Sequence, residues 1–286
     1  MKTLHLAGFA GEHGGFGSAN DCSEMPSLTE RLDRYLDAAP RSSAEPEEVG
    51  PFTLFRSRAP WPYYARPRIG LQRAIDSADL GRLADRCREL DLPLAIEWVG
   101  EVTPSLEPLA RAAGLEVEVH PLLVLDSSET SAEPDPAVEI LDADDPRLPA
   151  SRAIADVGFG TPGTEVGAAG ERERDERAAK VRQEVRDHVR RQIRAGLMVT
   201  AVTLDQNATG TLIPVGDTAE IVGVATLPAH RRRGLAGAIT RALVAEARRR
   251  GVTLVLLSAG SDEVARVYER AGFRRVGTHL AAAEVD

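Results

Sequence analysis

The chain has 286 residues and a formal net charge of −9, with 35 basic and 44 acidic side chains. This acidic balance argues against a general nucleic-acid binder, because affinity for phosphates depends on a cationic surface. The length allows one large or two ordinary domains with a substantial core. No run of 18 apolar residues occurs, so no membrane span and no membrane partner are expected.

Cysteine usage and the N-terminus bear on the compartment. Cys22 and Cys87 are the two cysteines, and they form no Cys-x-x-Cys pair, which suits a reducing cytoplasm and gives no signal of a metal site. The apolar stretch at residues 4–9 is too short for a signal peptide. Residues 1–25 are rich in glycine, and we interpret them as a flexible segment of a cytoplasmic protein.

Residues 26–125 predict a first domain of alternating helices and strands. Apolar residues at helical spacing predict a helix from Ser27 to about Pro40, followed by a polar, acidic connector over residues 41–50. We then expect a strand at 52–55, a helix over 80–90, a strand at 94–99, a helix over 106–113 and a strand at 115–125. Pro121 lies inside this last strand, which favours an edge strand or a bulge.

Residues 126–136 are rich in Ser, Thr, Glu and Pro and are interpreted as an interdomain linker. The second domain, residues 137–286, begins with a short strand and a helix over 146–157. A long surface helix over 171–195 comes next, because its charged sequence keeps one apolar face. We then expect strands at 198–204, 208–213 and 219–227 as an antiparallel meander, a helix ending at Gly251, a strand at 252–257, a helix over 262–271 and a final strand.

A basic loop of sequence Arg-Arg-Arg-Gly-Leu-Ala, residues 231–236, joins the meander to the following helix. The first amides of a helix have no partner within it and carry the positive end of its dipole, so such a loop can bind an anion. Gly234 permits close backbone approach, and Ala236 leaves room beside it. Taken alone, the loop is equally compatible with a solvated basic turn.

Two motifs in this second domain resemble those of the Gcn5-related N-acetyltransferases (GNAT). The basic loop is similar to the family's [Gln/Arg]-x-x-Gly-x-[Gly/Ala] loop, with Arg231, Gly234 and Ala236 at its defined positions. The segment Tyr-Glu-Arg-Ala-Gly-Phe at 268–273 is similar to the family's late helix, which ends in Tyr-Glu-x-x-Gly-Phe. The resemblance covers residues 137–284 and implies an α/β mixed sheet with the GNAT-like acyl-CoA acyltransferase fold.

The resemblance implies an acetyl-CoA-dependent N-acetyltransferase, in which an amine attacks the thioester directly and no metal takes part. In the family, the strand before the loop splays from its neighbour and pairs with the pantetheine arm, while loop amides hold the pyrophosphate. Carried over to this sequence, the residues that bind the acetyl-CoA co-substrate are Val222, Val224, Ala225, Thr226, Leu227, Arg231, Arg232, Arg233, Gly234, Leu235 and Ala236.

Two residues match catalytic positions of the family. Tyr268 matches the tyrosine that serves as general acid; its reference pKa near ~10 keeps it protonated at neutral pH. Alternatively, Tyr268 simply continues the apolar stripe of its helix. Glu220 lies eleven residues before Arg231, the spacing of the glutamate base in some members; an exposed edge residue at the entrance of a strand is the alternative. His230 and His279 are interpreted as structural or exposed.

The first domain looks like a degenerate second copy of the second. A shift of 158 residues carries Leu94 onto Val252 and the helical stripe before Gly114 onto the stripe that contains Tyr268. The same shift places Asp76 at the position of Gly234 and Ala110 at that of Tyr268, so cofactor binding is not expected there. The repeat predicts a tandem arrangement, with chance matching of apolar stripes as the alternative.

The acceptor is an amine that the sequence does not identify, and we expect no nucleic-acid partner. The first domain would cover the second, shape the acceptor pocket or form a homodimer. A non-catalytic acyl-CoA-binding or regulatory module is the main alternative function, and an interaction scaffold is a third.

Overall fold

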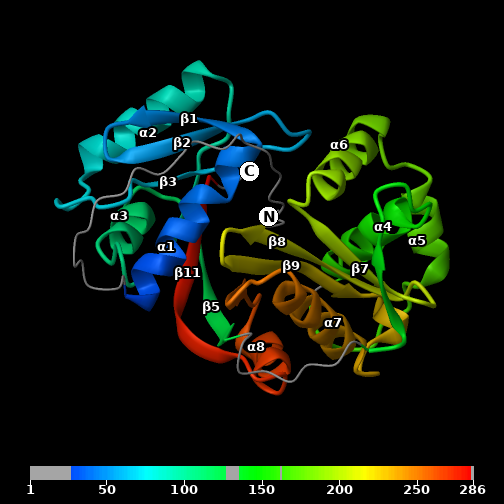
Figure 1. Ribbon diagram of the computed structural model, residues 1–286. Coiled ribbons are helices and arrows are strands. Elements are labelled where there is room, and N and C mark those ends of the chain that lie inside the picture. Colours follow the sequence, from blue (N-terminus) through cyan, green and yellow to red (C-terminus); the bar gives the residue numbers. More distant parts are fainter. Residues whose placement is uncertain (1–26, 127–134, 162, 285–286) are drawn as a thin grey trace.

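One continuous sheet organises the molecule. The computed structural model describes residues 27–126, 135–161 and 163–284. These residues form a mixed sheet of 11 strands with helices on both faces, in the order β1-β2-β3-β4-β11-β5-β10-β9-β8-β7-β6 (Figure 1). The predicted flexible segment 1–25 and most of the predicted linker lie outside the described residues.

The first half of the described chain, residues 27–126, contains the predicted elements and two more strands, β1 and β3. Its elements are α1 (Leu28–Ala38), a 3-10 turn (Pro40–Ser42), β1 (Ala44–Val49), β2 (Phe52–Ser57), β3 (Ala65–Pro67), α2 (Ser77–Glu89), β4 (Ala95–Val99), α3 (Leu106–Ala112) and β5 (Glu116–Asp126). The acidic connector predicted at 41–50 is wrong, because β1 runs there antiparallel to β2. β1 is an edge strand, and glutamates on an exposed edge disfavour further strand pairing.

The second half, residues 135–284, contains the predicted antiparallel meander. Its elements are β6 (Val138–Leu141), α4 (Leu148–Phe159), α5 (Glu171–Ala178), α6 (Gln183–Arg194), β7 (Val199–Thr203), β8 (Ala208–Val215), β9 (Thr218–Thr226), a 3-10 turn (Pro228–His230), α7 (Leu235–Arg249), β10 (Leu254–Ser258), α8 (Asp262–Glu269) and β11 (Arg274–Ala283). The single helix predicted over 171–195 is wrong. The Arg186 guanidinium donates to the carbonyls of Ala178 and Val181, which satisfies the end of α5 and the turn before α6.

The two halves exchange their last strands at the centre of the sheet. β11 lies between β4 and β5, and β5 lies between β11 and β10, all antiparallel. The edge position predicted from Pro121 is therefore wrong. Proline is tolerated in this central strand beside an irregularity of its partner, since the register of β11 shifts between Arg275 and Gly277. The predicted units 26–125 and 137–286 thus share one sheet, and their division stays a prediction.

The shift of 158 residues found in the sequence also relates helices and strands of the structure. The shift of 158 residues carries α2, β4, α3 and β5 onto α7, β10, α8 and β11, respectively. The sheet order is also symmetric, because β4, β3, β2 and β1 follow β11 on one side as β10, β9, β8 and β7 follow β5 on the other. Equivalent positions in the sequence therefore occupy equivalent places in the sheet.

Helices from both halves cover both faces. On one face, α7 and α8 pack over the second half, and α2 and α3 pack over the first. On the other face, α1 lies over the centre of the sheet, and its Tyr35 and Leu36 pack with Ile213, Val222 and Leu256 (Figure 1). A helix of the first half therefore covers strands β8, β9 and β10 of the second.

Candidate active site

The site is built around a split between two parallel strands. β9 pairs with β10 only from Thr218 to Glu220. Beyond this point β10 stays paired with β5 as far as Ser258, whereas β9 stays paired with β8 as far as Thr226. Within the described residues, the β10-facing edge of 221–226 thus has no strand partner. Its backbone can pair with an extended ligand, as the sequence predicts.

The side chains predicted along the pantetheine arm mostly build the core. Val222 is buried under α1, and Val224 packs on the opposite face toward α7. Ala225 and Leu227 are buried against α4, while Thr226 is half-buried. Gly158 permits this contact, since a Cβ there would lie 2.9 Å from the Cβ of Ala225. The backbone of this segment, and not its side chains, is what the split leaves accessible.

The start of α7 forms an open cradle. Gly234 is the N-cap residue with φ of 79°, and no side chain caps the helix. Arg232 has φ of 63°, an uncommon conformation for a residue other than glycine, and such strain concentrates at functional sites. A Cβ at Gly234 would meet no described atom within 4 Å. Leu235 and Ala236 begin the helix and are half-buried. Because no side chain caps the helix, its first amides are available to bind an anion.

The three arginines of the loop have different roles. Arg231 turns back toward α4, and its Nη2 donates to the carbonyls of Gly158 and Thr161 at 2.8 and 2.7 Å. Burial lowers the pKa of this guanidinium. Arg231 thereby anchors the loop to the end of α4. Arg232 and Arg233 are exposed; the first pairs with Glu165 and the second contacts His230 at 3.3 Å.

Tyr268 lies near the end of α8 within the core that α7 and α8 share. Its ring packs edge-on against Phe273, with centroids 6.1 Å apart. No hydrogen bond joins its hydroxyl to another described residue. Burial raises the pKa of the phenol well above its usual value. A phenol in such a place stays protonated and can donate.

Glu220 is buried at the point where the split begins, and it is not the exposed edge residue that the sequence also allowed. Its backbone N–H donates to the Tyr35 hydroxyl at 3.1 Å, and that hydroxyl donates to the Ile213 carbonyl at 2.8 Å. Burial raises the pKa of the Glu220 carboxyl to about 8, while the charge of Arg66 opposes the shift. A carboxyl with such a pKa can exchange a proton near neutral pH.

The structure adds buried polar residues to which the sequence analysis assigned no function. His279 is 1% exposed, and its Nδ1 lies 3.1 Å from Ser258 Oγ and its Nε2 lies 3.6 Å from Glu97 Oε2. Arg66 is also 1% exposed and pairs with Asp33 of α1. A signal was present, because charged residues within apolar strand sequences are rarely buried without a role. His230, by contrast, pairs with Glu171 beside the loop at 2.8 Å.

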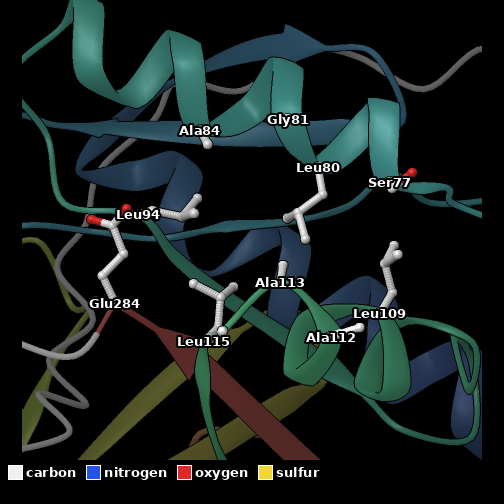
Figure 2. Close-up of a pocket in the computed structure, with 11 residues that line it drawn as sticks. Ser77, Leu80, Gly81, Ala84, Leu94, Leu109, Ala112, Ala113, Leu115 and Glu284 are labelled. Carbon is white, nitrogen blue, oxygen red and sulfur yellow. The ribbon is translucent and has the colours of Figure 1, made fainter.

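A large open cavity lies elsewhere, between α2 and α3 of the first half. Its volume is about 610 Å³, and small and apolar side chains line most of it, with Ser77 and Glu284 as its polar groups (Figure 2). At the matching position of Gly81, the second half has Ile239, which fills the core beneath α7. A smaller residue on α2 is thus one difference between this cavity and the packed core beneath α7.

Two further properties concern the described residues alone. No group of three or more His, Cys, Asp or Glu side chains there is arranged to hold a metal ion. None of the described helices is both long and apolar enough to span a bilayer.

Comparison with known proteins agrees with this geometry. Residues 173–273 match the model of the acetyltransferase (GNAT) family. The match confirms the resemblance inferred from the loop and the late helix: this part of the chain is a GNAT domain, and the reaction typical of that family is acetyl transfer. No curated protein matches the chain.

Solved structures extend the likeness to most of the chain. A GCN5-related N-acetyltransferase from Kribbella flavida has a TM-score of 0.64 at 21% identity, covering 91% of this chain and 96% of its own. A functionally unknown conserved protein from Staphylococcus epidermidis has a TM-score of 0.56 at 14% identity, with coverages of 87% and 96%. At these identities the likeness establishes the fold alone, which is the predicted GNAT-like mixed α/β fold.

Proposed function

We propose that this protein is an acetyl-CoA-dependent N-acetyltransferase with its active site at the split between β9 and β10. The observation that carries the proposal is the combination of an unpaired strand edge with an uncapped helix start directly after it. Acetyl-CoA would supply an activated acetyl thioester. The backbone of 222–227 would hold its pantetheine arm, and the amides of 232–236 its pyrophosphate.

In the proposed reaction, residues of this chain manage the protons. The Glu220 carboxylate takes a proton from the ammonium form of the acceptor, so that the nitrogen lone pair can attack the acetyl carbonyl. The carbon–sulfur bond then breaks, and the Tyr268 hydroxyl donates its proton to the departing sulfur. Positioned acids and bases of this kind typically contribute roughly 10²–10⁴-fold each.

We also propose that the first half is a degenerate GNAT-like unit that does not bind acetyl-CoA. At the position of Gly234 it has Asp76, whose carboxylate accepts from the Asp79 amide at 2.8 Å. The start of α2 is therefore occupied by its own side chains. The contribution of this half would be to cover the acceptor side of the site through α1.

Binding and turnover test the proposal together. Calorimetry with acetyl-CoA should give one site per chain, and a panel of small amines, amino acids and lysine peptides should include one that releases free thiol in an acceptor-dependent manner. Binding without thiol release across the panel would favour a non-catalytic acyl-CoA-binding module. Absence of binding would reject both functions and favour an interaction scaffold.

A further inference from the structure

A line of polar side chains connects the split with the first half of the chain. Ser258 ends β10, His279 lies on β11 and Glu97 lies on β4. Ser258 Oγ lies 3.1 Å from His279 Nδ1, and His279 Nε2 lies 3.6 Å from Glu97 Oε2. Strand exchange creates this line, because β11 of the second half runs directly beside β4 of the first.

Strand register places these side chains on the face that carries Glu220. Glu220 is paired with Leu256, and Ser258 follows two residues later on the same face. Ser258 is paired with Leu122, and two residues before it His120 is paired with His279. Two residues beyond His279, Ala281 is paired with Glu97. Ser258 lies just past the last β9–β10 pair, so its hydroxyl is at the mouth of the split.

The surroundings of Glu97 adapt it to accept and release a proton. Burial raises the pKa of its carboxyl to about 8; Glu220 contributes to this increase, and Arg66 opposes it. Asp33 binds Nη2 of Arg66, whereas Arg66 Nε and Nη1 are buried without a hydrogen-bond partner among the described residues. One buried guanidinium thus lowers the pKa of both carboxyls, against the effect of burial.

Other titratable groups face this cluster. Tyr64 lies near Glu97, Glu220 and Arg66, and its pKa is raised well above the usual value, first by burial. Tyr35 contacts the Glu220 backbone, and burial likewise raises its pKa. On β5, His120 is the register neighbour of His279, and its Nε2 lies 3.2 Å from Glu118.

We propose that Ser258, His279 and Glu97 form a proton relay that leads from the split into the first half of the chain. The inference rests on the acetyl transfer proposed above. An acceptor that arrives as an ammonium must lose two protons: Glu220 takes one so that the amine can attack, and the nitrogen still carries a surplus proton afterwards. That proton passes to Ser258 Oγ as the serine proton passes to His279 Nδ1, and the Nε2 proton passes to the Glu97 carboxylate.

The proton balance of the relay closes without any additional reactant. After the transfer Ser258 and His279 are neutral as before, and Glu97 has gained the proton, which it releases to solvent near its own pKa. The Nε2–Oε2 distance of 3.6 Å is longer than a hydrogen bond. Catalytic hydrogen bonds are often long in the absence of substrate and shorten in the complex, so this contact is expected to tighten.

Nitrogen-15 spectroscopy tests the relay independently of any acceptor. In the wild type, the chemical shifts of the two His279 ring nitrogens should change over the pH range in which Glu97 ionises. Glu97→Gln should alter this curve of chemical shift against pH. His120→Gln, at the neighbouring histidine, is the matched control and should leave the His279 curve nearly unchanged. Identical His279 curves in the wild type and in Glu97→Gln would overturn the relay, whether or not an amine is acetylated.

Chemical rescue tests its role in turnover. With an amine that the wild type acetylates, His279→Ala should lower kcat roughly 100-fold, within the range for one acid–base group, while acetyl-CoA affinity stays near wild type. Added imidazoles should restore the rate in proportion to their basicity, which a merely structural role would not produce. Full activity of His279→Ala, or rescue independent of imidazole basicity, would overturn the proposal. A wild type that binds acetyl-CoA but acetylates nothing would instead contradict the proposed function.

Discussion

The two halves differ most where their equivalent helices begin. At the start of α2, Asp76 and Asp79 form a reciprocal capping box, and Arg73 and Arg82 pair with the buried Asp79 carboxylate. At the start of α7, Gly234 provides no side chain and the first amides remain open. The same framework therefore has a helix start satisfied by its own side chains in one half and a helix start without a side-chain cap in the other. In the proposed function, this difference at one position distinguishes the half that binds acetyl-CoA from the half that does not.

The largest expected effect concerns the late helix, where Tyr268 of the second half stands in place of Ala110. Tyr268→Phe should lower turnover by roughly 10²–10⁴-fold, because the departing sulfur loses its proton donor. Acetyl-CoA affinity should hardly change, since the ring and its packing remain. Initial rates of thiol release and calorimetry measure the two quantities. Unchanged turnover would remove Tyr268 from the mechanism.

Copying the residue of the first half into the second should weaken cofactor binding strongly. Gly234→Asp places a carboxylate over the first amides of α7, where it competes with a pyrophosphate and repels it. We expect the Kd for acetyl-CoA to rise on the order of 100-fold, equivalent to about 2.7 kcal/mol.

Gly234→Ala is the matched control, because it places a side chain at the same positive-φ position without adding a charge. A non-glycine residue in this left-handed conformation costs about 1–2 kcal/mol. Both variants carry this cost and only Gly234→Asp adds a repelling charge, so Gly234→Ala should weaken binding clearly less. Equal losses in the two variants would attribute the effect to backbone strain and argue against an anion cradle.

The free energy of unfolding at low pH should depend on Asp79 at the capped start of α2. Hydrogen bonds from Arg73 and the Asp76 amide lower the pKa of Asp79 to about 2, below its value in the unfolded chain. The lowered pKa stabilises the fold above about pH 4 by up to about 2 kcal/mol, and this contribution is lost as the pH falls toward 2.

Asp79→Asn should therefore reduce the free energy of unfolding at pH 6 and flatten its decline between pH 4 and 2. Urea unfolding followed at several pH values measures both changes. Asp262→Asn is a suitable control, because Asp262 also pairs with an arginine but lies on the surface. An acid profile of Asp79→Asn parallel to that of the wild type would contradict the assignment.

The smallest expected effect concerns α2, where Gly81 corresponds to Ile239 of α7. A Cβ at Gly81 would meet no described atom within 4 Å. Gly81→Ala should therefore stabilise the protein by about 0.5–1 kcal/mol through helix propensity. Gly210→Ala is the opposing control. Its Cβ would lie 2.6 Å from Cγ2 of Ile239, so this variant should destabilise the protein. A thermal midpoint for Gly81→Ala below that of the wild type would contradict the expectation.

Sequence reasoning succeeded where local pattern decides structure. Apolar spacing gave α1, α2, α7 and α8 to within a few residues, and the meander followed from three short apolar runs with short connections. It failed at β1, whose glutamates conceal an edge strand, and at residues 179–182, where the Arg186 side chain folds back onto the carbonyls of Ala178 and Val181. Pro121 predicted an edge strand or a bulge. The edge is wrong, and the irregularity beside Pro121 lies on its partner β11, far along the chain.

The sequence by itself indicated the loop at Gly234 and the late helix with Tyr268, because each depends on residues close together in the chain. It also indicated the 158-residue shift that relates the elements of the two halves, because the pattern within each half is local. Only the tertiary structure decided that β5 and β11 cross between the halves, since pairing among distant strands depends on packing over the whole sheet. That exchange brings Glu97 to His279 and sets Arg66 near Glu220. The chemistry of the loop is therefore local, whereas the buried acid–base cluster exists only in the folded chain.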